Sequence, residues 1–279
     1  MKKLLITLIC LLALAACTDA RATLKKNEKL LQVGKESITE KEIFELMTEK
    51  YGADTVIAMI NDFIYEKVAD AQEDFTERIE SYSSLYAALY GPTYYQAFGF
   101  ASEAGFKAKL LQDYKTETIT KKYLENNFEA VVENYRPTKL AILQFDEYDD
   151  AAAALKSAKN GIPLQELAEE FKATEFSSGA PNIYTTSSNL SPEVISFGLY
   201  AEETGLVDIP LFSGDGKYYI VQVINVNRSS YKAEIIEVLT EVSSIADDAI
   251  KYYCEFYQLT YYDKNTVERL VYTNPSYLR

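Results

Sequence analysis

Cys17 is the residue of this chain whose surroundings most clearly point to chemistry. Lys2 and Lys3 precede an apolar run from Leu4 to Ala16, and small residues stand directly before the cysteine. A basic start, a short apolar stretch and small residues at a cut site are typical of an export signal. A helix of this length rises about 20 Å, which is too short for a bilayer core of ~30 Å. We therefore predict that residues 1–16 are a cleaved signal peptide and that Cys17 stands at the cut site.

The residues Leu14-Ala15-Ala16-Cys17 also resemble the lipobox of bacterial lipoproteins. The resemblance implies that Cys17 is diacylated, for example with palmitate, and becomes the mature amino terminus. Two acyl chains hold a protein on a membrane more stably than one. Residues 17–29 would then be a lipidated tether on the outer face of the cell membrane. The alternative is a plain cleaved signal in which Cys17 has no role.

The chain contains no histidine, and this excludes several kinds of catalytic site. Ser-His-Asp and Cys-His catalysis, His-ligated zinc and an imidazole base are all ruled out. Neither of the glycine-rich loops G-x-G-x-x-G and G-x-x-x-x-G-K-[ST], which bind nucleotides, occurs. We therefore expect neither a metal nor a cofactor. After cleavage only Cys254 accompanies Cys17, so no intramolecular disulfide is expected, and the sequence assigns no role to Cys254.

The composition is acidic and rich in tyrosine. The formal net charge is −14, and because an acidic fold repels phosphate backbones, nucleic acid is not an expected partner. The chain has 23 tyrosines and no tryptophan. Tyrosine-rich surfaces suit adaptable contacts with other chains, but the same residues can simply replace Phe and Trp in a core.

Residues 30–136 predict a mainly helical region. Thr39 and Glu42 have the spacing of a capping box at a helix start. We expect this helix to end at Gly52, since glycine commonly follows the last helical residue. Asp54 is then expected to cap the next helix.

At Pro137 the pattern changes to alternating strands and helices, which continue to residue 228. The final strand of this region is apolar except for Gln222, so we expect it at the centre of the sheet. The expected elements are a strand at 139–145, helices at 146–160 and 163–171, a short helix after Ser191, and strands at 207–212 and 218–226.

A third region begins at residue 229. Apolar residues recur at spacings of three and four from Ala233 to Gln258, which predicts one long amphipathic helix. We expect residues 229–279 to pack on the N-terminal region. The alternative is a homodimer in which this helix pairs with a second copy of the chain.

The region 137–228 resembles a parvulin, the small prolyl-isomerase domain, in four short motifs, and the flanks resemble the PrsA-type foldase lipoproteins. On the flanks, Ile38-Thr39-Glu40-Lys41-Glu42 matches an I-T-x-E-E helix start, and Tyr262-Asp263-Lys264-Asn265 resembles the family's short tail. The parvulin motifs are Ile142-Leu143 for S-H-I-L-V, residues 161–168 for G-x-D-F-x-E-L-A, residues 190–194 for M-x-P-E-F, and residues 218–223 for G-Y-H-I-I-x-V.

The resemblance implies an α+β fold. Helical segments at 30–136 and 229–279 would form one chaperone-like domain, with a parvulin-like βαααβαββ domain inserted at 137–228. It also implies a foldase, or rotamase, that binds unfolded or partly folded exported proteins outside the cytoplasm and isomerises their X-Pro bonds.

At the site itself the chain departs from the family. The family's two histidines fall on Ala141 and Tyr219, and its loop Cys or Asp falls near Thr174 or Glu175. An alanine side chain offers no hydrogen bond, so we expect isomerisation well below that of a parvulin with both histidines. The resemblance places the substrate pocket at Ile183, Leu190, Val194 and Tyr219.

Three functions stay open at this point. The first is a foldase with isomerase activity, and the second is a holdase that binds clients without catalysis. The third is a surface lipoprotein that binds a solute or a host molecule. A chaperone cleft would be broad and apolar, whereas a solute site would be a deep pocket with convergent polar groups.

Overall fold

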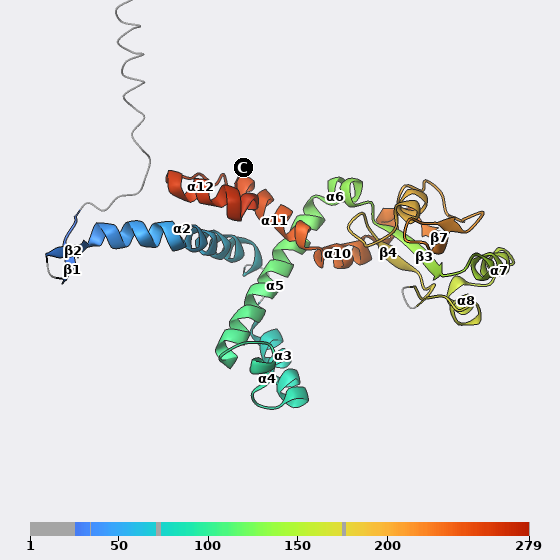
Figure 1. Cartoon of the computed structure of the whole chain (residues 1–279), viewed down its shortest axis with the longest axis horizontal. Coiled ribbons are helices and arrows are strands. Elements are labelled where there is room, and N and C mark those ends of the chain that lie inside the picture. Colours follow the sequence, from blue (N-terminus) through green and yellow to red (C-terminus); the bar gives the residue numbers. More distant parts are fainter. Residues whose placement is uncertain (1–25, 34, 71–73, 175–176, 279) are drawn as a thin grey trace, which may run out of the picture. The chain divides into compact units, whose positions relative to one another are not determined.

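The computed structural model describes residues 26–33, 35–70, 74–174 and 177–278 (Figure 1). The predicted signal peptide, Cys17 and Glu175 lie outside these residues. The chain forms two compact units, which we describe separately. Unit 1 contains the described residues up to Ile119 and those from Ala246 onward, and unit 2 runs from Thr120 to Ile245. Within the described ranges, no helix is both long and apolar enough to cross a membrane.

Unit 1 begins with a hairpin of β1 (Lys29–Val33) and β2 (Glu36–Thr39), which leads directly into α2 (Glu40–Ile64). The predicted capping box is present at the start of α2. The backbone N–H of Thr39 donates to the Glu42 carboxylate at 2.8 Å, and the Thr39 hydroxyl accepts from the backbone N–H of Glu42 at 3.4 Å. This local prediction is confirmed.

The predicted end of the helix at Gly52 is wrong, and Asp54 is not a helix cap, because α2 continues to Ile64. A glycine inside a helix costs about 1 kcal/mol relative to alanine. Buried residues beyond it, among them Ala53 and Ile64, continue the apolar face of the helix and outweigh that cost. The helix then runs into a π-helical turn at Tyr65–Ala69.

The remainder of unit 1 is helical. The segment after α12 is fixed to α2, because the Tyr277 hydroxyl donates to Asn61 Oδ1 at 2.7 Å. The helices are α3 (Thr76–Tyr90), α4 (Tyr94–Ala97), the first part of α5 (Glu103–Asn126), most of α11 (Ser243–Phe256), α12 (Lys264–Thr273) and a 3-10 turn at Pro275–Tyr277.

Unit 2 is built on an antiparallel sheet in the order β4-β3-β7-β5, with β6 also paired to β7 (Figure 1). The central pair, β3 and β7, is apolar over most of its length, which fits strands that are covered on both faces. The strands are β3 (Thr138–Phe145), β4 (Asn182–Tyr184), β5 (Gly205–Leu206), β6 (Leu211–Phe212) and β7 (Tyr218–Asn225).

Helices cover the two faces of this sheet. Side chains alternate along a strand, so one face carries Ala141, Leu143 and Ile220, which pack with α7 (Tyr148–Lys159) and α8 (Leu164–Glu170). The other face carries Leu140, Ile142 and Val221, which pack with α9 (Pro192–Val194) and a π-helical turn at Ile195–Leu199.

A third apolar cluster joins the helices at the ends of unit 2. It contains Leu124 at the end of α5, Phe128 of α6 (Phe128–Tyr135), Ile183 of β4, and Ile235 and Leu239 of α10 (Lys232–Thr240). A 3-10 turn at Arg228–Tyr231 precedes α10. The α+β class is confirmed, although the described residues between β3 and β4 form two helices rather than three.

The single helix predicted from Ala233 to Gln258 is wrong, because α10 ends at Thr240 and α11 begins at Ser243. The Thr240 hydroxyl donates to the Ile236 carbonyl at 2.7 Å, a bond that competes with the helical ladder. The β-branched Val242 and two serines follow, and all are weaker helix formers than alanine. The first half of the predicted seam therefore packs inside unit 2.

The strand predicted at 207–212 is likewise wrong over most of its length, because β5 ends at Leu206 and β6 covers only Leu211–Phe212. Pro210 stands between them, and proline has no N–H to donate to a neighbouring strand. The boundaries predicted for the inserted region, 137 and 228, stay a prediction.

Candidate functional site

Gln144 and Tyr219 form the polar centre of the sheet face that is covered by α9. They lie directly opposite each other on β3 and β7. Gln144 is 8% exposed and Tyr219 is 2% exposed, among apolar neighbours that include Leu140 and Ile142. Two buried polar side chains in such surroundings require hydrogen-bond partners.

These partners form a chain of hydrogen bonds. The Thr174 hydroxyl donates to Gln144 Oε1 at 2.5 Å, and Gln144 Nε2 donates to the Tyr219 hydroxyl at 2.6 Å. The Tyr219 hydroxyl in turn donates to Asp215 Oδ2 at 2.6 Å. The backbone adds two further bonds, since the Thr174 N–H donates to the Gln144 carbonyl and the Gln144 N–H donates to the Ser177 hydroxyl. Each donor therefore points to the next residue, and the chain ends on a carboxylate.

Asp215 is held in place by the turn between β6 and β7. Its second carboxylate oxygen, Oδ1, accepts from the backbone N–H of Lys217 at 3.0 Å. Burial, and then the hydrogen bond to Asp215, raise the pKa of the Tyr219 phenol to about 12. The same hydrogen bond lowers the pKa of the Asp215 carboxyl below its usual value. At neutral pH the phenol is therefore protonated and its proton is directed at Asp215.

A second carboxylate lies close enough to act on this group. The negative charge of Glu193, on α9, also raises the pKa of Tyr219. Glu193 Oε2 is buried and has no hydrogen-bond partner among the described residues. The site therefore contains two acids near one phenol, which is a poor arrangement for receiving a substrate carbonyl oxygen.

The structure brings only some of the predicted site residues together. Tyr219, Val194 and Leu190 share one apolar cluster. Ala141 lies on the opposite face of the sheet, among the residues packed on α7 and α8. Ile183 belongs to the cluster of α5, α6 and α10. Ala141 and Tyr219 therefore do not lie on the same face of the sheet, and their catalytic assignment stays a prediction.

Sequence reasoning missed Gln144 and Asp215. Gln144 is the only strongly polar residue between Leu140 and Phe145, and that was a usable signal. Asp215 lies in the turn between β6 and β7, outside every predicted element, and its side chain reaches Tyr219 from four residues away. Among the residues that the structure describes, no group of three metal-ligating side chains is suited to hold an ion.

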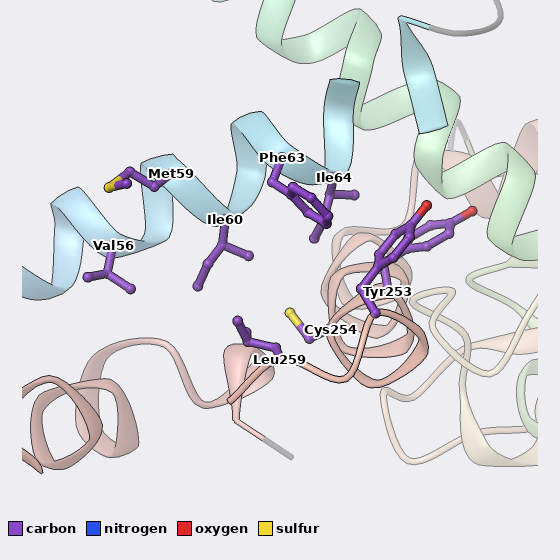
Figure 2. A pocket seen from close by; sticks show the side chains of 9 residues that line it. Val56, Met59, Ile60, Phe63, Ile64, Tyr253, Cys254 and Leu259 are labelled. Carbon is purple, nitrogen blue, oxygen red and sulfur yellow. The ribbon is translucent and has the colours of Figure 1, made fainter. Parts of the chain in front are cut away.

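Unit 1 contains a different kind of feature, an open apolar groove of about 410 Å³ between α2 and the end of α11. Figure 2 shows Ile60 of α2 facing Cys254 and Leu259. Met59 is 68% exposed at the rim, whereas Cys254 is 3% exposed. The residues that line the groove are Val56, Met59, Ile60, Phe63, Ile64, Tyr253, Cys254, Tyr257 and Leu259.

The wall of the groove is partly aromatic. The rings of Phe63 and Tyr257 meet edge to face, with 5.2 Å between their centroids. Methionine and aromatic side chains adapt to different apolar partners, because the thioether is flexible and the rings are large and polarizable. The groove is suited to bind apolar side chains and offers few polar groups to orient a small solute.

Comparison with known proteins gives the following matches. Residues 116–234 match the family model of the PPIC-type PPIase domain. No curated protein matches the chain. The foldase protein PrsA of Streptococcus pneumoniae is 17% identical, with a TM-score of 0.44, over 87% of this chain and 98% of that one. The peptidylprolyl isomerase PrsA of Bacillus cereus is 15% identical, with a TM-score of 0.44, over 88% and 97%. The PrsA of Bacillus subtilis is 13% identical, with a TM-score of 0.36, over 85% and 96%.

The matched family segment extends beyond the predicted region 137–228 at both ends. It includes α6, every strand of the unit 2 sheet and the first residues of α10. The sheet, the helices on its two faces and the Gln144–Tyr219 pair all lie within it. Residues 116–234 of this chain are therefore a parvulin domain of the PPIC-type peptidyl-prolyl isomerase family.

Proposed function

We propose that this protein is a lipid-anchored, extracytoplasmic foldase that acts mainly by holding unfolded exported chains, with prolyl isomerisation as a weak second activity. The observation that carries the proposal is the parvulin domain whose central polar groups are bonded to one another. Export and anchoring are inferred from residues 1–17, and client binding is assigned to the apolar groove of unit 1.

Weak isomerisation follows from the hydrogen bonds of the site. Rotation about an X-Pro bond must pass a barrier of ~18–20 kcal/mol, and an enzyme lowers it by favouring the twisted amide. Fixed donors directed at the substrate supply much of such stabilisation. Here the Tyr219 hydroxyl donates to Asp215 and one Gln144 N–H donates to Tyr219. Apolar residues such as Leu190 and Val194 still offer a surface for a proline ring.

Holding activity follows from the groove of unit 1. Unfolded chains expose apolar side chains, and burying them in an apolar groove is favourable at about 25 cal/mol per Å². The third function, binding of a solute, receives no support from this groove because its lining is almost entirely apolar.

A protease-coupled assay with a proline tetrapeptide tests the isomerase part. It uses the chain from Thr18 onward, which keeps every described residue. We expect a rate well below that of a parvulin with both histidines. A rate equal to that of such an enzyme would refute the argument from the hydrogen-bond chain.

Suppression of aggregation of a reduced, unfolded model protein tests the holding part. We expect Met59→Glu to reduce the suppression, because it places a charge at the rim of the groove. Val271→Glu is the matched control, since Val271 is an exposed apolar residue of α12 that does not line the groove. Equal suppression by both variants would show that clients bind elsewhere.

A further inference from the structure

Residues 81–102 contain no Lys, Arg, Asp or Glu, although 25% of the residues in the chain are charged. This segment, which we call the aromatic tip, comprises the last two thirds of α3, the short helix α4 and the loop before α5 (Figure 1). Seven of its residues are aromatic: Tyr82, Tyr86, Tyr90, Tyr94, Tyr95, Phe98 and Phe100.

The aromatic tip is a packed cluster of rings with an inner and an outer layer. Phe106 of α5 and Tyr94 are buried, with 5.2 Å between their ring centroids. Tyr86 contacts Phe98 at 4.9 Å and Phe106 at 5.8 Å. Tyr90 meets Phe98 at 5.8 Å on the outside. The rings support one another, so the outer side chains are held in place by packing.

The outer layer is unusually apolar for a surface. Leu89 is 65% exposed and Tyr90 is 58% exposed, and Leu85 and Phe98 are also exposed. A contiguous apolar surface of this kind marks a site of interaction.

Charged residues resume at both ends of the tip and are paired there. Lys107 binds Glu80 at 2.8 Å and Glu103 at 3.0 Å. These two acids are the first charged residues on either side of the segment. Lys107 therefore pairs with the acidic residue on each side of the segment. We call Glu80, Glu103 and Lys107 the charged collar, and residues 81–102 beyond it carry no charge.

We propose that the aromatic tip inserts into the interfacial zone of a lipid bilayer. Charged side chains are costly in that zone, whereas Tyr and Phe are favoured at it. A protein interface normally has a polar rim and would not require the loss of every charge. The ten residues of α3 beyond the collar rise about 15 Å, which exceeds the ~5–10 Å to which interfacial segments are buried.

The acidic net charge of the chain indicates which lipid headgroups the tip would bind. A net charge of −14 is not attracted to anionic headgroups. The tip carries no basic residue either, so its binding must come from apolar burial. The favoured partner is therefore an uncharged, zwitterionic lipid surface, and binding should persist in high salt.

Tryptophan probes test insertion directly, because the chain contains no tryptophan. Leu89→Trp and Val271→Trp are made in the chain from Thr18 onward, where no leader or acyl chain contributes. With phosphatidylcholine vesicles, we expect the emission of the Leu89→Trp protein to shift to shorter wavelength and to be quenched by brominated lipid. The Val271→Trp protein should show neither effect, although Val271 is also an exposed apolar residue outside the groove. No shift in the Leu89→Trp protein would overturn the proposal.

Vesicle flotation gives an independent measure. We expect Leu89→Glu to lower the fraction bound to phosphatidylcholine vesicles by about tenfold or more, and Val271→Glu to leave it unchanged. Leu85→Gln, which adds no charge, should give a smaller loss, and circular dichroism checks that each variant is folded. If Leu89→Glu instead abolishes self-association or client holding without any vesicle binding by the wild type, the tip is a protein-binding surface and the proposal is wrong.

Discussion

The polar site of unit 2 and the apolar groove of unit 1 differ in whether their side chains already have partners. In unit 2 the polar groups of Thr174, Gln144, Tyr219 and Asp215 are bonded to one another. In unit 1 the apolar side chains around Met59 face open space. A polar group that is already satisfied gains little from a new partner, whereas exposed apolar area gains from any apolar partner. The proposed division of roles, client holding in unit 1 and weak isomerisation in unit 2, rests on this contrast.

The largest expected effect is the loss of stability when a histidine is placed at Ala141, on the α7–α8 face of the unit 2 sheet. Ala141 packs against Leu143 and Ile220 on the α7–α8 face, so a histidine there must enter a filled core. Overpacking and an unsatisfied ring nitrogen together cost about 2–5 kcal/mol. We expect Ala141→His to lower the free energy of urea unfolding by that amount and to add no isomerase activity. A stable Ala141→His, Tyr219→His protein with increased activity would show that both positions do share one site.

The matched comparison is a histidine on the other face of the same strand. Gln144→His with Tyr219→His places both rings on the α9 face, where the two residues are opposite each other. We expect this pair to retain the fold better than the Ala141 pair. If either double variant gains isomerase activity, we expect it to be this one.

The second effect concerns the phenol of Tyr219. Tyr219→Phe removes the hydroxyl that Gln144 and Asp215 both use. Leaving the buried Gln144 amide unsatisfied costs about 1–3 kcal/mol, whereas Asp215 is exposed and can bind water instead. Tyr272→Phe is the control, because Tyr272 is 87% exposed and should change little. Equal stability of the Tyr219→Phe protein and the wild type would mean that water replaces the hydroxyl at no cost.

How far the sequence predicted these features depends on how local they are. The capping box of Thr39 and Glu42 uses residues three apart, and it was predicted correctly. The end of α2 depends on what the apolar face beyond Gly52 packs against, so a local rule for glycine gave the wrong answer. The break at Thr240 was missed because the apolar seam continues through it.

The candidate site shows a stricter limit. A motif match can place a residue on a strand, but the pairing register decides which face it occupies, and a shift by one residue reverses the face. Ala141 was aligned with a family histidine, yet the structure places it with α7 and α8, while Gln144 shares the face of Tyr219. Leu190 and Val194 do share an apolar cluster with Tyr219, and their assignment to a substrate pocket stays a prediction.

A third, smaller effect is expected in the pH dependence of the difference between wild type and Tyr219→Phe. Asp215 has a lowered pKa in the folded protein, so its contribution is present above its unfolded pKa and is lost as pH falls through the folded value. Tyr219 has a raised pKa of about 12, so its contribution is present below its unfolded pKa of about 10 and is lost as pH rises toward 12. The difference in unfolding free energy between wild type and Tyr219→Phe should therefore be largest at intermediate pH. It should become smaller in acid, where Asp215 is protonated, and in alkali, where Tyr219 ionises. Urea unfolding across this range measures it, and a constant difference would contradict the assigned hydrogen bond.

The smallest expected effect concerns the thiol at the base of the groove. In the chain from Thr18 onward Cys254 is the only cysteine, so alkylation reports on it alone. It is 3% exposed and lines the groove, which predicts slow reaction in the folded protein and fast reaction in urea. A bound unfolded chain protects Cys254 only while it occupies the groove. At a client concentration near Kd the groove is about half occupied, so the alkylation rate of Cys254 in the folded protein should fall about twofold. Met59→Glu should remove this further protection while Val271→Glu keeps it. If a client whose aggregation the protein suppresses leaves the alkylation rate of Cys254 unchanged, clients do not bind in the groove. The contrast between a closed polar site in unit 2 and an open apolar groove in unit 1 would then not explain how the protein holds clients.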